Sequence, residues 1–301
     1  MILGLLSAFC GLSYADEYRN VQFYRGTGTV RWDLLTHLVY IDFTHIDASG
    51  EFVAHTPEEI LLITNLQSEA RSRSKVFMLS YGEGVADVMP MLTNTTKRAA
   101  YIAAIVNVAN TYDLDGIDID FEYPYATEER DALDVFFAEL RTALGPARLL
   151  SADVAFGKRL TASMINENLD WVQTMRYHYR TASQSAGDLA LWTGDGVAEG
   201  KINLGVPFSG KSTNSTVPWD ICYQSFVDSI SPYDPAINSV YHAPYSGTFH
   251  FVGVDLQKEK MRVAADGGNG TMVWHHACDV DDPDRSLAVS LHDEIVRYVA
   301  P

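Results

Sequence analysis

After Asp16, the chain alternates between short apolar runs and longer stretches in which apolar residues recur every three or four positions. The short runs are rich in β-branched and aromatic residues, and most of them are apolar throughout. Strands that are covered on both faces have this pattern. The sequence therefore predicts eight buried strands: Val21–Tyr24, His37–Phe43, Lys75–Ser80, Leu114–Phe121, Leu149–Ala155, Trp171–Tyr177, Lys201–Val206 and Thr271–Trp274.

The stretches between most of these runs have the periodicity of amphipathic helices. The first of them begins with Thr56, a favourable N-cap residue, followed by Pro57 at the first helical position. The predicted helices are Pro57–Arg73, Thr96–Tyr112, Thr127–Leu144, Gly187–Glu199, Leu256–Ala265 and Asp284–Val299.

Alternation of strands and helices up to eight strands predicts a parallel sheet that closes into a (β/α)8 TIM barrel. An open doubly wound sheet is the alternative, but the first strand is not followed by a glycine-rich phosphate loop. The first two strands are joined by little more than Trp32–Leu35, so the first helix should be short or absent. Lys211–Gly253 is irregular, and we expect a long loop there rather than a full α+β insertion domain.

The composition fits one globular α/β domain over residues 16–301. Apolar residues make up 47% of the 301 residues, which excludes a disordered chain. The 22 lysines and arginines against 39 aspartates and glutamates give a net charge of −17. Because the sequence contains no basic block, this charge disfavours binding of nucleic acid.

The N-terminal segment Met1–Ala15 is mostly apolar and uncharged. It is too short to span a bilayer, and Ser13-Tyr14-Ala15 places small residues where signal peptidase cleaves. We expect a signal peptide over residues 1–15 and an extracellular protein that is not in the membrane; a buried first strand is the alternative reading of this segment.

Two cysteines, Cys222 and Cys278, would remain after removal of Cys10 with such a peptide. They are compatible with one disulfide or with two buried thiols, and the sequence leaves both open. Three glycosylation sequons begin at Asn94, Asn214 and Asn269, a modest sign of a secreted glycoprotein.

The most informative segment is Asp115–Pro124, with the sequence DGIDIDFEYP. Side chains alternate along a strand, so Asp118, Asp120 and Glu122 should share one face, opposite an apolar face that packs on the helices. The three carboxyls then line the barrel interior, with Glu122 at the C-terminal mouth, where barrel enzymes carry their chemistry.

Same-face neighbours on a strand lie ~7 Å apart, so burial and repulsion should raise at least one carboxyl pKa. A carboxyl that keeps its proton near neutral pH is what a glycosidase uses to protonate a leaving oxygen. The alternatives are a buried salt-bridge network or a site for a hard metal ion. We expect neither metal nor cofactor, because a stiff strand differs from the flexible loops that bind calcium.

The spacing Asp115-x-x-Asp118-x-Asp120-x-Glu122 resembles the D-x-x-D-x-D-x-E signature of the family 18 glycoside hydrolases, the chitinases and their relatives. The resemblance extends from about Val21 to the C-terminus. KVFMLSYGEG at Lys75–Gly84 is similar to the family's third strand with its S-x-G-G motif, and QTMRY at Gln173–Tyr177 to the sixth strand with M-x-Y-D. KINLGVPF and TMVW are similar to the seventh and eighth strands.

This resemblance implies a monomeric barrel hydrolase of β-1,4-linked N-acetylglucosamine polymers or oligomers, with a nucleophile supplied by the substrate. Glu122 would be the general acid and base, and Asp120 would orient the 2-acetamido group. Asp118 would share a proton with Asp120, and Tyr177 would hydrogen-bond the acetamido oxygen. Endo cleavage is expected, because the segment before the eighth strand is short and the groove should be shallow.

Further residues are predicted to bind the sugar. Trp274 would form the floor of the pocket and Met175 part of its wall, and Tyr24 ends the first strand at the mouth. The remaining candidates, Gly82, Tyr123 and His178, belong to or follow the family-like motifs.

The chain departs from the family pattern at two positions, where Glu83 replaces a glycine and His178 an aspartate. These changes keep open a non-catalytic glycan-binding lectin on the same barrel. An endo-β-N-acetylglucosaminidase acting on N-glycans is a third hypothesis, although the Tyr123-Pro124 ending is more typical of chitinases.

Other conspicuous residues have simpler interpretations. Asp115 is out of phase with the other carboxyls and should brace the strand, and His37 should be a core histidine. The pair His275-His276 should line the mouth or lie on the surface, and metal binding is the alternative. For Trp32, Trp192 and Trp219, a packing role is at least as probable as a sugar-binding one.

Overall fold

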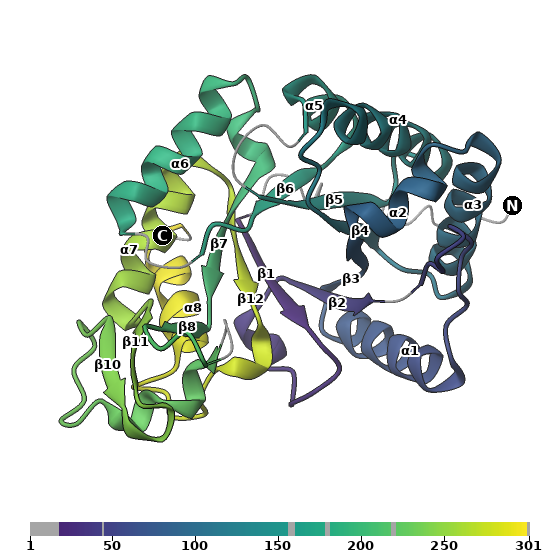
Figure 1. Ribbon diagram of the computed structural model, residues 1–301. Coiled ribbons are helices and arrows are strands. Elements are labelled where there is room, and N and C mark those ends of the chain that lie inside the picture. Colours follow the sequence, from purple (N-terminus) through teal and green to yellow (C-terminus); the bar gives the residue numbers. More distant parts are fainter. Residues whose placement is uncertain (1–17, 44, 156–159, 178–180, 218–220, 300–301) are drawn as a thin grey trace, which may run out of the picture.

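The computed structural model describes residues 18–299 except 44, 156–159, 178–180 and 218–220. Eight parallel strands form a closed barrel in the order β1-β12-β7-β6-β5-β4-β3-β2, and helices surround it (Figure 1). The predicted (β/α)8 barrel is therefore confirmed. The N-terminal segment, Cys10, His178 and Trp219 lie outside the described residues.

The barrel strands correspond to the eight apolar runs, with boundaries shifted by a few residues. They are β1 (Arg19–Tyr24), β2 (His37–Phe43), β3 (Val76–Gly84), β4 (Gly116–Glu122), β5 (Leu149–Val154), β6 (Trp171–Thr174), β7 (Ile202–Pro207) and β12 (Gly270–Trp274). As expected, only a single turn of 3-10 helix, Trp32–Leu34, separates β1 from β2.

The surrounding helices are α1 (Pro57–Ser72), α2 (Val85–Leu92), α3 (Thr95–Thr111), α4 (Thr127–Leu144), α5 (Ala162–Asn168), α6 (Ala182–Gly194), α7 (Val254–Gly267) and α8 (Leu287–Tyr298). Thr56 caps α1 as predicted, and Glu59 completes a capping box. No helix in these ranges is long and apolar enough to cross a membrane.

Two helix predictions need correction. The helix predicted at Gly187–Glu199 runs from Ala182 to Gly194, so it begins and ends five residues earlier, and Thr181 and Gln184 form the capping box at its start. The helices α2 and α5 were not predicted. Both are short, at 8 and 7 residues, and α2 contains Pro90.

The segment predicted as a long irregular loop, Lys211–Gly253, instead contributes short strands to a four-stranded antiparallel sheet with the order β10-β11-β8-β9. Its strands are β8 (Ser209–Ser212), β9 (Ile221–Cys222), β10 (Ser239–His242) and β11 (Gly247–Phe251), seen at the lower left of Figure 1. The sheet holds together because Phe226 stacks on Phe249, with ring centroids 5.0 Å apart. A disulfide joins Cys222 to Cys278, which answers the question that the sequence left open.

The barrel separates two apolar cores. The larger core fills the space between strands and helices. The smaller one lies inside the barrel and consists of Val21, Phe23, Val39, Ile41, Val76, Met78, Trp171 and Met272. Arg19 reaches the base of this inner core, where its guanidinium lies 4.9 Å from the ring centroid of Trp171.

Candidate active site

The strand β4 carries its carboxyls on the inner face, as its alternation predicts. Ile117, Ile119 and Phe121 belong to the outer core, whereas Asp118 and Asp120 are buried on the opposite face. Glu122 ends the strand and is half-buried. Asp118, Asp120 and Glu122 therefore form a row, here called the acidic row, from the barrel interior to its C-terminal mouth.

Asp118 is the deepest carboxyl and the one with the most hydrogen bonds. Ser80 on β3 donates to its Oδ2 at 2.7 Å, and Ser151 on β5 to its Oδ1 at 2.5 Å. Gln173 on β6 also donates to Oδ1, at 3.2 Å. Burial raises the pKa of Asp118, and these donors oppose that effect because they stabilise the anion.

Asp120 lies one step nearer the mouth, opposite Gly82 on β3. The pKa of Asp120 is raised well above its ordinary value, first by burial and then by the charges of Glu122 and Asp118. Its hydrogen bond to Glu122 requires a proton, since two carboxylates cannot share one otherwise. Burial and these charges therefore favour the protonated form of Asp120 beside Glu122.

Tyr123 follows directly after Glu122 and is half-buried. Burial, a hydrogen bond with Glu122 and the charge of Glu122 together raise the pKa of the Tyr123 hydroxyl. The phenol therefore stays neutral and is a hydrogen-bond partner for the Glu122 carboxyl.

Met175, Tyr177 and Trp274 pack at the mouth end of the inner core, and all three are partly exposed. The Trp274 ring lies 5.9 Å from that of Phe23, and the Arg25 guanidinium lies 5.8 Å from the Trp274 centroid. The absence of a side chain at Gly205 on β7 makes room for Tyr177, because a Cβ there would lie 2.8 Å from the ring. The structure thus brings these three predicted residues together beside the acidic row.

Two other predicted binding residues are not part of this group. Tyr24 points away from the barrel interior into the outer core, near Tyr40, and its hydroxyl donates to the carbonyl of Gly28 at 3.1 Å. It is Phe23 that faces inward from β1. His178 lies outside the described residues.

The departure at Glu83 does not place a further carboxyl in the acidic row. Ser80 and Gly82 face inward beside Asp118 and Asp120, so alternation turns Glu83 outward. In agreement, the charge of Glu83 contributes to raising the pKa of Tyr101, a residue of the outer core.

Of the simpler interpretations, those of Asp115 and His37 hold, and that of His276 is wrong. Asp115 braces β4, since its Oδ2 accepts a hydrogen bond from the Phe77 amide at 2.9 Å. His37 is a core residue whose pKa is lowered to about 3 by burial. His276 is buried rather than exposed or lining the mouth, and contacts Gln22 at 2.7 Å.

The interior contains a fourth carboxyl that sequence reasoning missed. Asp153 on β5 is buried, and the charges of Asp118 and Asp120 act on it. The signal was present: Ser151 and Asp153 alternate with Leu150, Ala152 and Val154, in the same pattern as the acidic strand. The donors Ser151 and Gln173 were also not singled out.

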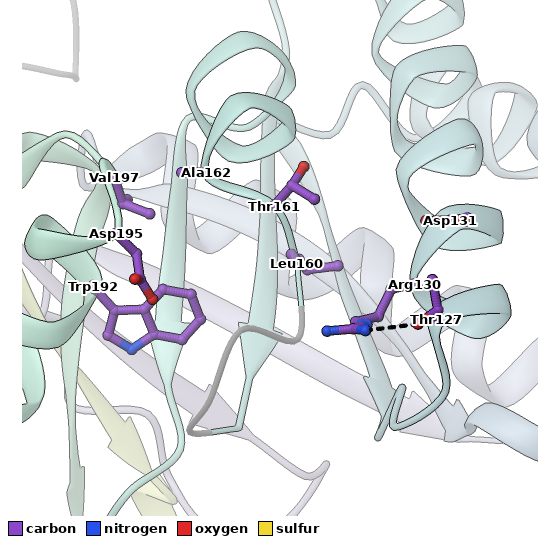
Figure 2. A pocket seen from close by; sticks show the side chains of 9 residues that line it. All are labelled: Thr127, Arg130, Asp131, Leu160, Thr161, Ala162, Trp192, Asp195 and Val197. Atoms are coloured by element: carbon purple, nitrogen blue, oxygen red, sulfur yellow. Dashed lines mark hydrogen bonds between the residues drawn. The ribbon is translucent and has the colours of Figure 1, made fainter.

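Away from the acidic row, a surface pocket of about 350 Å³ lies against α4, α5 and α6. Figure 2 shows the residues that line it: Thr127, Arg130, Asp131, Leu160, Thr161, Ala162, Trp192, Asp195 and Val197. Trp192 is 5% exposed and Trp32 is equally buried, so both have the packing role that the sequence allowed.

Two groups of side chains in the described ranges have metal-ligand spacing. In the first, Cys222 and Cys278 are joined in the disulfide beside His275. The second comprises His45, His55 and Glu59, between β2 and the first turn of α1. Neither group includes a carboxyl of the acidic row.

A parallel eight-stranded barrel with buried carboxyls of raised pKa and partly exposed aromatic rings at its C-terminal end has the architecture of a barrel glycosidase. The family model described as "Glycosyl hydrolases family 18" matches residues 12–279, and the chain belongs to this family.

Relatives include Nod factor hydrolase protein 1 of Medicago truncatula, 31% identical over 154 residues, which are 40% of each chain. A class V chitinase of the same plant is 26% identical over 61% of this chain and 59% of its own. The matches thus span about half the length of these relatives. Among solved structures, a mutant class V chitinase from Nicotiana tobaccum in complex with NAG4 has a TM-score of 0.75 and 18% identity, over 92% of this chain and 99% of that one.

Proposed function

We propose that this protein is a secreted, endo-acting chitinase that hydrolyses β-1,4-linked N-acetylglucosamine by a substrate-assisted, retaining mechanism. The observation that carries the proposal is the row of Asp118, Asp120 and Glu122. Hydrogen bonds favour the anion on the deepest carboxyl, and burial with repulsion keeps a proton on the next one, in contact with Glu122.

In the first half of the reaction, the carbonyl oxygen of the substrate's 2-acetamido group attacks the anomeric carbon. The bond from that carbon to the leaving oxygen breaks, and the leaving oxygen takes the proton of Glu122. Asp120 orients the acetamido group, and Tyr177 donates a hydrogen bond to its oxygen. A preorganised donor of this kind stabilises charge that develops in the transition state.

In the second half, the Glu122 carboxylate takes a proton from a water molecule. The water oxygen attacks the anomeric carbon and displaces the acetamido oxygen. The proton taken from the water regenerates the protonated form of Glu122. Two displacements at one carbon return the β configuration. Trp274 supports the apolar face of the sugar through both steps, with Met175 beside it.

The test is product analysis on soluble N-acetylglucosamine oligomers with the wild type and Glu122→Gln. Loss of proton transfer should lower kcat by roughly 10²–10⁴ while the fold, followed by circular dichroism, is retained. Glu128→Gln, an exposed glutamate in the first turn of α4, is the matched control and should retain full activity.

The same assay separates the alternatives. Products from internal bonds with the β anomer first in an NMR time course support the proposal, and cello-oligosaccharides, which lack the acetamido group, should not be cut. An inverted first product would rule out the mechanism. Binding without hydrolysis by the wild type would favour a lectin, and release of intact N-glycans would favour an endo-β-N-acetylglucosaminidase.

The extracellular part of the proposal is supported by the Cys222–Cys278 disulfide, since disulfides persist mainly in oxidising compartments.

A further inference from the structure

The fourth carboxyl of the barrel interior, Asp153, has surroundings unlike those of the other three. It follows Ala152, which pairs with Ile119, so it comes level with Asp120 on the neighbouring strand. Both of its oxygens are inaccessible to solvent, and neither accepts a hydrogen bond from a donor in the described part of the chain. Asp118, by contrast, accepts three such bonds.

An ionised carboxylate cannot remain in such a place without donors, because an unpaired buried charge is strongly destabilised. The group with which Asp153 forms a hydrogen bond is the carboxyl of Asp118, and that bond needs a proton. Since Asp118 already has donors on both oxygens, the anion is favoured on Asp118 and the proton on Asp153.

The charges around Asp153 act in the same direction. Asp118, Asp120 and Glu122 face it from β4, and Tyr177 faces it from the segment after β6. Burial and the three carboxyls raise the pKa of Asp153 well above its usual range, and burial also raises the pKa of the Tyr177 hydroxyl, which therefore stays neutral. The same cluster thus favours the neutral form of both groups.

We propose that Asp153 is a protonated positioning residue of the active site, which donates a hydrogen bond to Asp118 and fixes the negative charge there. That charge keeps the proton on Asp120 beside Glu122. The inference rests on the proposed function for its catalytic consequence, but the protonation of Asp153 is independent of it.

The decisive variants are Asp153→Asn and Asp153→Ala. The amide of asparagine is uncharged, similar in size and still able to donate to Asp118, whereas alanine removes the donor. Asp115→Asn is the matched control, because Asp115 is a partly buried carboxyl whose hydrogen bond braces the base of the same sheet.

The first measurement is kcat and KM on a soluble N-acetylglucosamine oligomer across the acid and basic limbs of the pH profile. Asp153→Asn should stay within about threefold of wild-type kcat with both limbs unchanged. Asp153→Ala should lose about tenfold to a hundredfold in kcat, as expected for one hydrogen bond to a charged group, with KM nearly constant. Its acid limb should move to higher pH, because Asp118 without this donor holds a proton more tightly.

Two other results would overturn the proposal. If Asp153 is ionised, Asp153→Asn removes a negative charge beside Glu122, and the basic limb moves to lower pH. If Asp153 only supports packing, both variants lose stability and rate while the limbs stay where they are, as in the Asp115→Asn control.

The second measurement needs no substrate. The infrared spectrum of the folded protein at neutral pH should contain the C=O stretching band of a protonated carboxyl, and this band should weaken in Asp153→Asn but not when Asp115 is replaced. An unchanged band would overturn the proposal whatever the activity. An inactive wild type would contradict the proposed function instead.

Discussion

The two ends of the barrel interior both bury titratable groups, but the hydrogen-bond partners of these groups differ. At the base, Arg19 donates to Asn203 Oδ1 at 3.0 Å and to the carbonyl of Gly200 at 2.7 Å, and His37 lies edge-on to Trp171. At the mouth, Asp120 and Asp153 have oxygens that no protein donor in the described ranges reaches.

The two ends also differ in the direction in which burial shifts the pKa values of their groups. His37 has its pKa lowered to about 3, so it stays neutral through the range in which most enzymes work. The buried carboxyls Asp118, Asp120 and Asp153 have their pKa values raised above the ordinary value, first by burial. The base therefore has a fixed charge state in that range, whereas carboxyls with raised pKa values at the mouth can hold and release protons.

Among the substitutions that test this comparison, Arg19→Met at the base should have the largest effect on stability. Removing the guanidinium leaves the Asn203 and Gly200 oxygens without their donor, and each unsatisfied buried acceptor costs ~1–3 kcal/mol. The free energy of unfolding should fall by about 2–5 kcal/mol. Denaturant unfolding measures it, and the pH profile of kcat/KM should not move. A shifted profile would show that the base also sets the charges at the mouth.

A second prediction concerns the pH dependence of stability, which should have opposite signs at the two ends. His37 is neutral when folded but titrates at 6.5 when unfolded, so protons stabilise the unfolded chain as the pH falls below 6.5. For Asp120 the folded pKa is raised, so the folded state binds more protons and loses stability as the pH rises above the unfolded value of 3.8.

Denaturant unfolding at pH 7.5 and pH 5 should therefore give contrasting slopes. Relative to the wild type, His37→Gln should gain about 2 kcal/mol on acidification, because a penalty of that size disappears. Asp120→Asn should change in the other direction. Parallel slopes for the two variants would mean that the ends do not differ in charge state.

The smallest effect is expected from Glu83→Gly, which restores the glycine of the family pattern. Because alternation turns Glu83 outward toward the helices, its charge is not in the acidic row. We expect less than about a twofold change in kcat/KM and unchanged limbs, since surface-layer substitutions usually change free energies by ~0.5 kcal/mol or less. A moved basic limb would place Glu83 at the mouth instead.

Strict alternation along strands is what made the acidic row predictable. The two-residue period fixes Asp118, Asp120 and Glu122 on one face without knowledge of any neighbour. The same rule places Tyr24 outward once Phe23 is inward, so the prediction for Tyr24 failed because position at a strand end was given more weight than alternation.

Other features depend on contacts between strands, which a single sequence does not contain. That Ser151 pairs with Asp118, and that Asp153 comes level with Asp120, follows from the register of β5 on β4. The small sheet was missed because its strands have two to five residues, too few to establish a period. The capping box at Thr181, however, was readable from the residue types.

The disulfide between Cys222 and Cys278 has a consequence for chain topology. It closes a covalent ring over a sequence separation of 56 residues, and that ring contains β10, β11, α7 and β12. The strand that closes the barrel against β1 is therefore a segment of the same covalent ring as β10 and β11 of the small sheet. In the chain-entropy description, such a ring removes about 4 kcal/mol of conformational freedom from the unfolded chain. With the disulfide formed, closure of the barrel would therefore cost less conformational entropy than in the reduced chain.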